Sequence, residues 1–324
     1  MQGKVLNIGG TGGDKLNVYA QLAEPSKKDG IWIKTEKGPL TEVGYTKLSN
    51  IPANFFNSDR ASVIIEENIY LFGLDTDCLK AYKYDTLTDT YTQLSDIPYA
   101  FEEGGVAAIG TNVYLFGGYN SSYRQYAYKY DTLTDTYTRL TDIPYEFYNA
   151  GVVAIGTNVY LFGSYNSSYS QYVYKYDTLT NSYTRLTDIY MNFYSAGTVA
   201  IESDVYLIGT SNNSYTKKIY KYNIDTTTGS FVSTLPYAFF DEAVAAIGTD
   251  IYIFGNYSSS GTNTKAYKYD TLTNSYTQLT DIPYQFYNAG AEAIGTNVYL
   301  FGGYRRTYNS IQIRTITIPI YNKI

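Results

Sequence analysis

The sequence is poor in the residues that carry most enzyme and metal chemistry. Among its 324 residues there is no histidine, one cysteine and one tryptophan. Histidine is the commonest general base and metal ligand, so its absence argues against catalysis and metal binding. The lone Cys78 cannot form an intramolecular disulfide. We therefore expect a protein that is not an enzyme and that holds no metal and no cofactor.

Long apolar runs are also missing. No stretch approaches the roughly 18 residues of a membrane span, so membrane insertion is not expected. The segment MQGKVLNIGG lacks the apolar core of a signal peptide. We therefore expect the protein to be made without a signal peptide. The formal net charge is -6, whereas a nucleic-acid-binding face needs clustered lysine and arginine. We expect no nucleic-acid partner.

Tyrosine is the residue in excess, with 41 copies. An AT-rich genome would favour tyrosine codons, and this accounts for part of the number. It does not account for the placement, because the tyrosines recur at fixed positions. The Tyr of a YKYD element falls at 82, 128, 174 and 220, 46 residues apart, and again at 267. A constant period of this size is the signature of a repeat architecture.

Each repeat divides into four short runs of strand type, separated by Gly, Asn, Asp and Ser. In the clearest copy these are residues 104–110, 112–118, 125–131 and 136–140. The second run is apolar throughout, as in a strand covered on both faces, and the third and fourth alternate at period two. The innermost run is built from small residues, which suits strands crowded around an axis. Four antiparallel strands per period predict an all-β fold, a β-propeller.

The order of the strands predicts how the ring closes. A fourth-strand copy at 44–52 precedes the first complete repeat, and the last repeat ends with a third-strand copy at 311–317. We expect the N-terminal strand to complete the last blade, giving six blades without an open edge. A seven-bladed ring is the alternative, with residues 4–10 and 16–22 as strands of a further blade. The expected division is an N-terminal module at 1–43, the propeller at 44–317 and a tail at 318–324.

The repeat resembles the kelch motif over about residues 44–317. That family has an apolar strand ending in a double glycine, followed by a tyrosine-bearing strand and a strand opened by an aromatic residue. The double glycine stands at 117–118 and 302–303, and one glycine remains in the other copies. The position that the family gives to tryptophan is held here by Tyr91, Tyr137, Tyr183, Tyr276 and Phe231. The resemblance implies a six-bladed kelch-type propeller with four-stranded antiparallel blades.

A second resemblance lies near the N-terminus. The string Glu24, Pro25, Lys28, Gly30, Ile31, Trp32, Ile33, Lys34, Thr35 resembles the N-terminal module of phage and prophage tail-associated proteins of Gram-positive hosts. It implies a protein of the virion tail or baseplate that docks to other tail proteins through Trp32. The other interpretation is a cap that packs on one blade.

Strand alternation separates the loops into two faces. The first carries GTN and DTLTDT turns, in which Asp131 and Asp135 are predicted to be turn residues and not calcium ligands. The second carries loops and blade links rich in Tyr, Ser and Asn, which suit adaptable recognition. Phe101, Phe147 and Phe286 on this face are expected to fill gaps between blades. The predicted ligand-binding residues are Tyr99, Tyr119, Asn120, Tyr123, Arg124, Tyr145, Tyr148, Tyr165, Asn166, Tyr169, Tyr194, Tyr215, Tyr237, Tyr257, Tyr287, Tyr304 and Arg305, with Arg306 beside them.

These features favour a phage or phage-tail-like particle protein that recognises the bacterial host surface. Its ligand would be a surface glycan or a surface protein. The alternatives are a structural tail protein and an intracellular kelch adaptor that binds another protein. Carboxylates unique to one loop, at Asp75, Asp77, Asp241 and Glu242, offer little support for catalysis.

Overall fold

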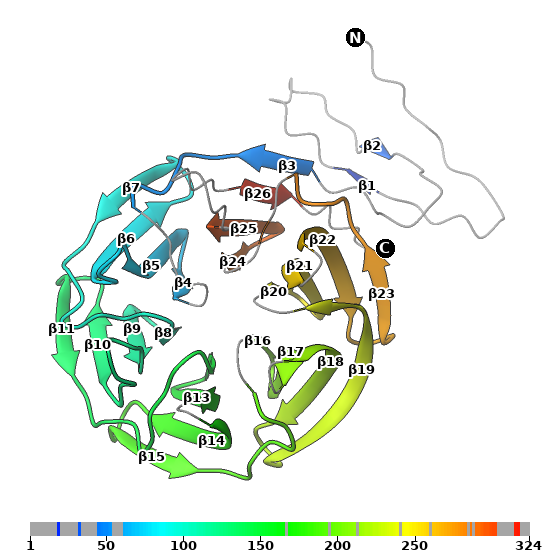
Figure 1. The fold of residues 1–324 in the computed structure, drawn as a ribbon. Helices are drawn as coiled ribbons and strands as arrows, with labels where there is room; N and C mark the ends of the chain where they lie inside the picture. Colours follow the sequence, from blue (N-terminus) through cyan, green and yellow to red (C-terminus); the bar gives the residue numbers. More distant parts are fainter. Residues whose placement is uncertain are drawn as a thin grey trace.

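Antiparallel sheets stand like blades around a central axis in the computed structural model (Figure 1). The innermost strand of each blade borders the axis and the outermost strand forms the rim. The structure describes residues 44–53, 61–165, 168–193, 196–211, 214–239, 242–258, 261–283, 286, 289–302 and 314–317, together with 18–19 and 32–33.

Five sheets are each built from four consecutive strands, ordered from the axis outwards. The first three of them comprise β4 (Ser62–Ile65), β5 (Asn68–Leu74), β6 (Lys80–Asp85), β7 (Thr90–Gln93); β8 (Gly105–Ile109), β9 (Asn112–Phe116), β10 (Ala127–Asp131), β11 (Thr136–Arg139); and β12 (Gly151–Ile155), β13 (Asn158–Tyr165), β14 (Tyr169–Asp177), β15 (Ser182–Arg185). The next two comprise β16 (Ala196–Ile201), β17 (Asp204–Ser211), β18 (Ser214–Asn223), β19 (Thr228–Phe239); and β20 (Ala243–Ile247), β21 (Asp250–Ser258), β22 (Gly261–Asp270), β23 (Ser275–Gln278).

A further four-stranded sheet joins the two ends of the repeat region. It consists of β24 (Ala289–Ile294), β25 (Asn297–Gly302), β26 (Arg314–Thr317) and β3 (Gly44–Lys47). β3 pairs antiparallel with β26, with Tyr45 opposite Ile316. This is the pairing that the strand order predicts. It leaves the last sheet with an outer strand taken from the N-terminal side (Figure 1).

Outside these blades, the two-residue strands β1 (Val18–Tyr19) and β2 (Trp32–Ile33) pair with each other. The seven-bladed alternative would require β1 to belong to a blade. In the part of the chain that the structure describes, β1 joins none. The rest of the predicted N-terminal module at 1–43 and the tail at 318–324 lie outside the described residues.

The hydrophobic core lies between blades rather than within one. Strand β9 is buried from Val113 to Phe116, because neighbouring blades cover both faces of the sheet. Phe116 meets Tyr176 of the next blade edge-on, with ring centroids 5.5 Å apart. The same cluster includes residues of β8, β10, β12 and β13. Each blade is therefore stabilised by its neighbours, as the repeat pattern implies.

The glycine that ends the second strand has a steric role. Gly117 adopts a φ of 72°, and a Cβ atom placed there would lie 1.9 Å from the carbonyl oxygen of Phe147. Gly163 repeats the arrangement against Phe193, at 2.3 Å. A side chain at either position would separate the strand from the link into the next blade, so glycine is required there.

A hydrogen-bonded contact between blades recurs at the hairpin between the third and fourth strands. Asp135 of the β10–β11 hairpin has a φ of 55°, a conformation that Asp and Asn tolerate better than most residues. Its Oδ1 accepts the buried Tyr130 hydroxyl at 2.7 Å and the backbone N–H of Ser95 in the preceding blade at 2.9 Å. We call this arrangement the interblade staple.

The staple is copied around the ring. Asp89 links Tyr84 to Ser49, which follows β3, and so joins the first and last sheets. Asn181 links Tyr176 to Thr141. The structure also gives Tyr269 a bond to Asn274. In the β18–β19 hairpin, Thr227 stands where the other hairpins carry the Asp or Asn acceptor. There the Tyr222 hydroxyl donates directly to the Thr187 carbonyl of the preceding blade at 2.9 Å. The third-strand tyrosines with 0% exposure are Tyr84, Tyr130, Tyr176, Tyr222 and Tyr269.

The staple holds Asp135 in its ionised form. Burial alone would raise the pKa of this carboxyl, but the hydrogen bonds from Ser95 and Tyr130 outweigh that effect and lower the pKa. Burial raises the pKa of the Tyr130 phenol, as does its bond to Asp135, so Tyr130 stays a neutral donor. The staple is a charge-assisted contact between a phenol, a backbone amide and a carboxylate.

Replacing Asp135 tests the staple. Asp135→Ala leaves the buried Tyr130 hydroxyl without its acceptor, and we expect a loss of about 1–3 kcal/mol in the free energy of unfolding. Asp135→Asn is the matched control, because Asn181 and Asn274 do the same work in other blades. Urea unfolding of both variants makes the measurement. Equal stability of the Ala variant and the wild type would contradict the assignment.

Removing the N-terminal strand tests the closure. Deleting residues 1–52 removes β3 and exposes the edge of β26, so we expect cooperative unfolding at a clearly lower temperature. Deleting residues 1–40 keeps β3 and should leave the melting temperature near that of the full chain. The closure would be refuted if the two truncated proteins melted together with the full chain.

Candidate functional site

The loop between β9 and β10 has an ordered backbone. Tyr119 donates its N–H to the Glu102 carbonyl at 3.0 Å and forms an isolated antiparallel bridge with Tyr123. Between them Ser121 has a φ of 58°, which turns the chain back on itself. The Arg124 N–H then bonds to the Gly118 carbonyl at 2.9 Å. The loop therefore holds its two tyrosines side by side.

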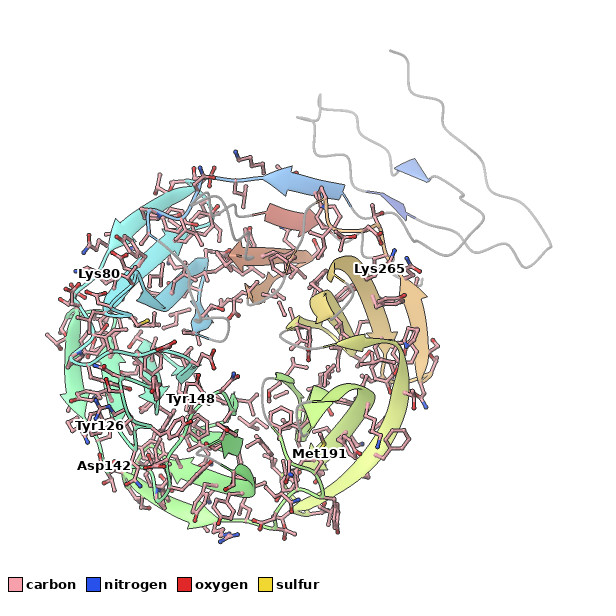
Figure 2. The ribbon with its side chains drawn as sticks, viewed as in Figure 1. Lys80, Tyr126, Asp142, Tyr148, Met191 and Lys265 are labelled. Atoms are coloured by element: carbon pink, nitrogen blue, oxygen red, sulfur yellow. The ribbon has the colours of Figure 1, made fainter. Side chains whose placement is uncertain are left out.

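Four tyrosines from two adjacent blades meet on this face. The ring centroids of Tyr119, Tyr123 and Tyr148 are 5.3–5.7 Å apart in all three pairs, and the rings are inclined by 55–60°. Tyr165 meets Tyr123 edge-on at 6.1 Å. These four residues, all partly exposed, are called the tyrosine platform below. Figure 2 places Tyr148 towards the centre of the ring, away from the rim residues Tyr126 and Asp142.

The spacing of the platform determines what it can bind. Aromatic rings 5–6 Å apart already touch each other, so nothing fits between them. This excludes an aromatic cage around a cation. The rings instead support one another while each remains partly exposed to solvent. That is the geometry of a surface on which a flat or ring-shaped ligand can lie.

Buried groups fix the platform from below. The Tyr148 N–H donates to Oγ of Ser164 at 3.1 Å, and that hydroxyl donates to the Glu146 carbonyl at 2.7 Å. Ser164 is 1% exposed. Tyr165 donates its N–H to the Tyr148 carbonyl at 3.2 Å. The second blade therefore holds Tyr148 and Tyr165 against the loop of the first.

The platform is electrically neutral and rich in hydrogen-bonding groups. Burial, with smaller contributions from Tyr165, Tyr119 and Glu146, raises the pKa of the Tyr123 phenol, so it remains a hydroxyl at physiological pH. Next to the platform, Arg124 donates through Nη2 to the Asn120 carbonyl at 3.0 Å. The neighbouring positive charge is thus held by the same loop.

Six of the predicted ligand-binding residues therefore lie together: the four platform tyrosines with Asn120 and Arg124. For a second group of predicted ligand-binding residues, and for Trp32, the structure describes the backbone as part of a strand but does not describe the side chain. A third group lies outside the described residues, so its role stays a prediction. The backbone-only residues are Tyr169, Tyr215, Tyr237 and Tyr257, and the undescribed residues are Asn166, Tyr194, Tyr287, Tyr304, Arg305 and Arg306.

Two predicted ligand residues belong to the packing between blades, which corrects that prediction. Tyr145 is 8% exposed, and its hydroxyl donates to the Gly163 carbonyl at 3.1 Å. Its ring stacks on Tyr174 with centroids 5.1 Å apart. Tyr99 stacks on Tyr128 in the same way at 5.2 Å. Both rings pack between blades, in clusters that combine residues of two adjacent sheets.

Two predictions for the two faces are confirmed, the packing of three phenylalanines between blades and the turn role of Asp131. Phe101, Phe147 and Phe286 are 0% exposed and fill the gaps between blades. Asp131 is a turn residue whose Oδ1 accepts the N–H of Leu133 at 2.9 Å. The described residues contain no group of three His, Cys, Asp or Glu side chains arranged to hold a metal.

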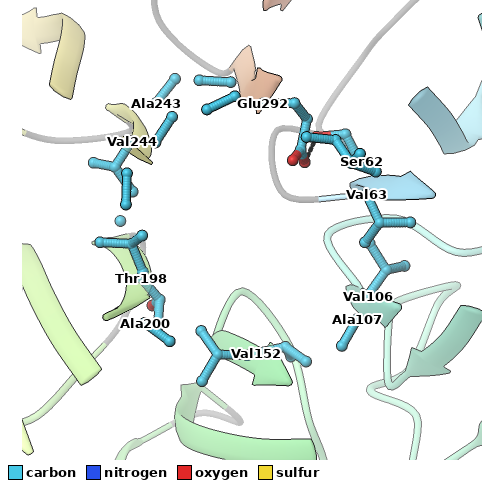
Figure 3. A pocket seen from close by; sticks show the side chains of 18 of the residues that line it. Ser62, Val63, Val106, Ala107, Val152, Thr198, Ala200, Ala243, Val244 and Glu292 are labelled. Atoms are coloured by element: carbon cyan, nitrogen blue, oxygen red, sulfur yellow. Dashed lines mark hydrogen bonds between the residues drawn. The ribbon is translucent and has the colours of Figure 1, made fainter. Parts of the chain in front are cut away.

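A second feature is a channel along the axis, which sequence reasoning missed. A cavity of about 390 Å³ lies between the innermost strands (Figure 3). Most of its wall is small and apolar, as the sequence of the innermost strands predicts. Two acidic residues, Glu242 and Glu292, break that pattern. The sequence does mark Glu292 as unusual. It stands in the innermost strand AGAEAI at a position where the other repeats carry a small or apolar residue.

Glu292 lies where the last blade meets the first. Its Oε1 accepts the Ser62 hydroxyl at 2.7 Å, so the pair bridges β24 and β4. The side chain keeps some contact with the channel but is otherwise surrounded by protein. Burial therefore raises its pKa to about 8, although the bond from Ser62 acts in the opposite direction. Glu242, 3% exposed, accepts the Gly197 N–H at 2.8 Å.

Comparison with known proteins identifies the class. The Kelch motif model matches residues 103–144 and 146–188, which are the β8–β11 and β12–β15 blades. The solved structure of YjhT is similar, with a TM-score of 0.72 and 13% identity over 84% of this chain and 97% of that one. No curated protein matches the sequence. The protein is an all-β propeller with kelch repeats.

The described residues include no helix long and apolar enough to cross a membrane.

The environment of Glu292 predicts how stability depends on pH. The folded-state pKa of about 8 lies above the ordinary value of 4.5, so between these pH values only the unfolded chain has this carboxyl ionised. Ionisation thus favours unfolding, and the contribution of Glu292 to stability falls by about 1.4 kcal/mol per pH unit across that window. In Glu292→Gln this fall is absent.

The measurement is the melting temperature of Glu292→Gln and wild type from pH 5 to 9. We expect the melting temperature of the variant to rise relative to that of the wild type from pH 5 to 8. Above pH 8 the difference between the two should stay constant. Asp225→Asn, which removes an exposed carboxylate from the β18–β19 hairpin, is the control. A constant difference across the range would show that Glu292 is not held neutral.

Proposed function

We propose that the protein is a non-enzymatic binding protein that recognises its ligand through the tyrosine platform. The observation that carries this is the contact of four partly exposed tyrosine rings, contributed by two blades and fixed by buried hydrogen bonds. Kelch repeats arranged as a propeller support a binding role, and the platform is the surface that we propose for it.

The ligand that suits the platform best is a glycan of the bacterial surface. The face of a sugar ring is lined by C–H groups that pack against the electron-rich face of an aromatic ring. The phenol hydroxyls of the platform and the groups of Asn120 and Arg124 can bond to the sugar hydroxyls at its edge. Tyrosine rings are rigid and amphipathic, so ordering them on binding costs little conformational entropy.

The proposed context is a phage or phage-tail-like particle, supported by the resemblance of residues 24–35 to tail-associated proteins. The propeller would face the host while the N-terminal segment docks to tail or baseplate proteins. A surface protein is the second candidate ligand, supported by the kelch repeats themselves.

Binding to Gram-positive cells and to their extracted wall polysaccharide tests the proposal. We expect saturable binding of fluorescently labelled protein, and a loss of about tenfold or more in affinity for Tyr123→Ala, because stacking against an aromatic ring contributes about 0.5–1.5 kcal/mol beyond its buried area. Tyr123→Phe keeps the ring and should keep most of the affinity.

The matched control is Tyr190→Ala, which removes a tyrosine that is 76% exposed and outside the platform. Its binding should equal that of the wild type. Binding to protease-treated cells separates a glycan from a protein ligand. Undiminished binding by a folded Tyr123→Ala protein would contradict the platform, and an absence of binding to cells and polysaccharide alike would contradict the proposed ligand.

A further inference from the structure

We propose that the axial channel is a second binding site, which takes a small organic cation bearing a primary ammonium group and pairs it with the Glu292 carboxylate. This inference does not depend on the proposed function, because the channel and the tyrosine platform share no residue.

The channel has an apolar wall and a polar corner. Val106, Val152 and Val244 line it from three different blades, and Ser62 and Glu292 form the corner where the last and first blades meet (Figure 3). A cavity of about 390 Å³ is within the range of small-molecule sites. Its shape suits a ligand with a short apolar body and one polar end.

The charges of the wall select the sign of that polar end. Among the described residues that line the channel, Glu242 and Glu292 are the ionisable ones, and none is a lysine or an arginine. The charged side chains that a ligand would meet among these residues are therefore carboxylates. A cation would be attracted to these carboxylates. The attraction is stronger than in water because the effective dielectric constant inside the protein is lower.

Glu292 has an oxygen available for the ligand. Oε1 accepts the Ser62 hydroxyl at 2.7 Å, and the structure shows no hydrogen bond from a described residue to Oε2. Glu292 lines the channel and is only partly buried, so Oε2 is the oxygen left for a ligand there. An ammonium group can therefore reach Oε2 while the bond to Ser62 holds the carboxylate in place.

Binding of the cation is coupled to loss of the Glu292 proton. Among the described residues of the elements packed around Glu292, few others are titratable. Tyr299 of β25 lies opposite it in register and Glu242 precedes β20, while β4 offers the neutral Ser62. The pKa of about 8 arises from burial, opposed only by the bond from Ser62. About one tenth of the protein carries ionised Glu292 at pH 7 and about nine tenths at pH 9. The affinity for a cation should therefore rise about tenfold between these pH values.

The test is calorimetric titration of the full-length protein with n-butylammonium chloride at pH 7 and pH 9. An alkylammonium group keeps its charge over this range, since its pKa resembles that of lysine at about 10.4. 1-Butanol, which has the same chain and no charge, is the control ligand. We expect butylammonium to bind about tenfold more tightly at pH 9 than at pH 7, and butanol to show no such change.

Two variants locate the site. Glu292→Gln keeps the shape and the bond to Ser62 but cannot ionise, so it should lose the pH dependence and at least tenfold of the affinity at pH 9. Tyr123→Ala should bind butylammonium as the wild type does, which separates this site from the platform. The proposal is overturned if butanol binds equally well, if Glu292→Gln binds butylammonium unchanged, or if no binding is seen at either pH.

Discussion

The architecture depends on the contact between one blade and the next. A four-stranded blade buries both faces only against its neighbours, so every blade needs two partners and the ring needs closure. Where it is present, the interblade staple makes this contact specific. In it, Asp135 or its equivalent takes a phenol from its own blade and a backbone amide from the preceding one. Asp89 extends the staple to Ser49, beside the strand that completes the last sheet.

The same constraint explains where the tyrosines are. One fully buried tyrosine of the third strand supplies the phenol of each staple, as Tyr130 does, whereas Tyr99 and Tyr145 pack between blades. Four other tyrosines among the described residues, from two blades, form the platform that we propose for recognition. Its rigidity comes from the packing between blades as well, because Ser164 and the Phe147 link position Tyr148 against the neighbouring loop. The packing between blades and the proposed binding surface are therefore parts of one repeated arrangement.

Much of the fold could be predicted because the repeat restates each local signal. The four strands, the glycine at the end of the second strand and the pairing of residues 44–47 with the last sheet all follow from strand order and residue type. The staple could not be predicted, since a turn aspartate looks the same whether or not it reaches the next blade. The platform was only partly predicted, because strand alternation does not extend into a blade link and so did not reveal that Tyr145 packs between blades. Glu292 departs from its repeat by a single residue, and its pairing with Ser62 is visible only once the ring closes.

Hydroxyl-radical footprinting of the protein, free and bound to intact Gram-positive cells, tests recognition by the platform most directly. The account predicts that oxidation of Tyr119, Tyr123, Tyr148 and Tyr165 falls together on binding, while the exposed Tyr190 is oxidised as before. Protection confined to other parts of the surface, with the platform oxidised equally in both states, would contradict it.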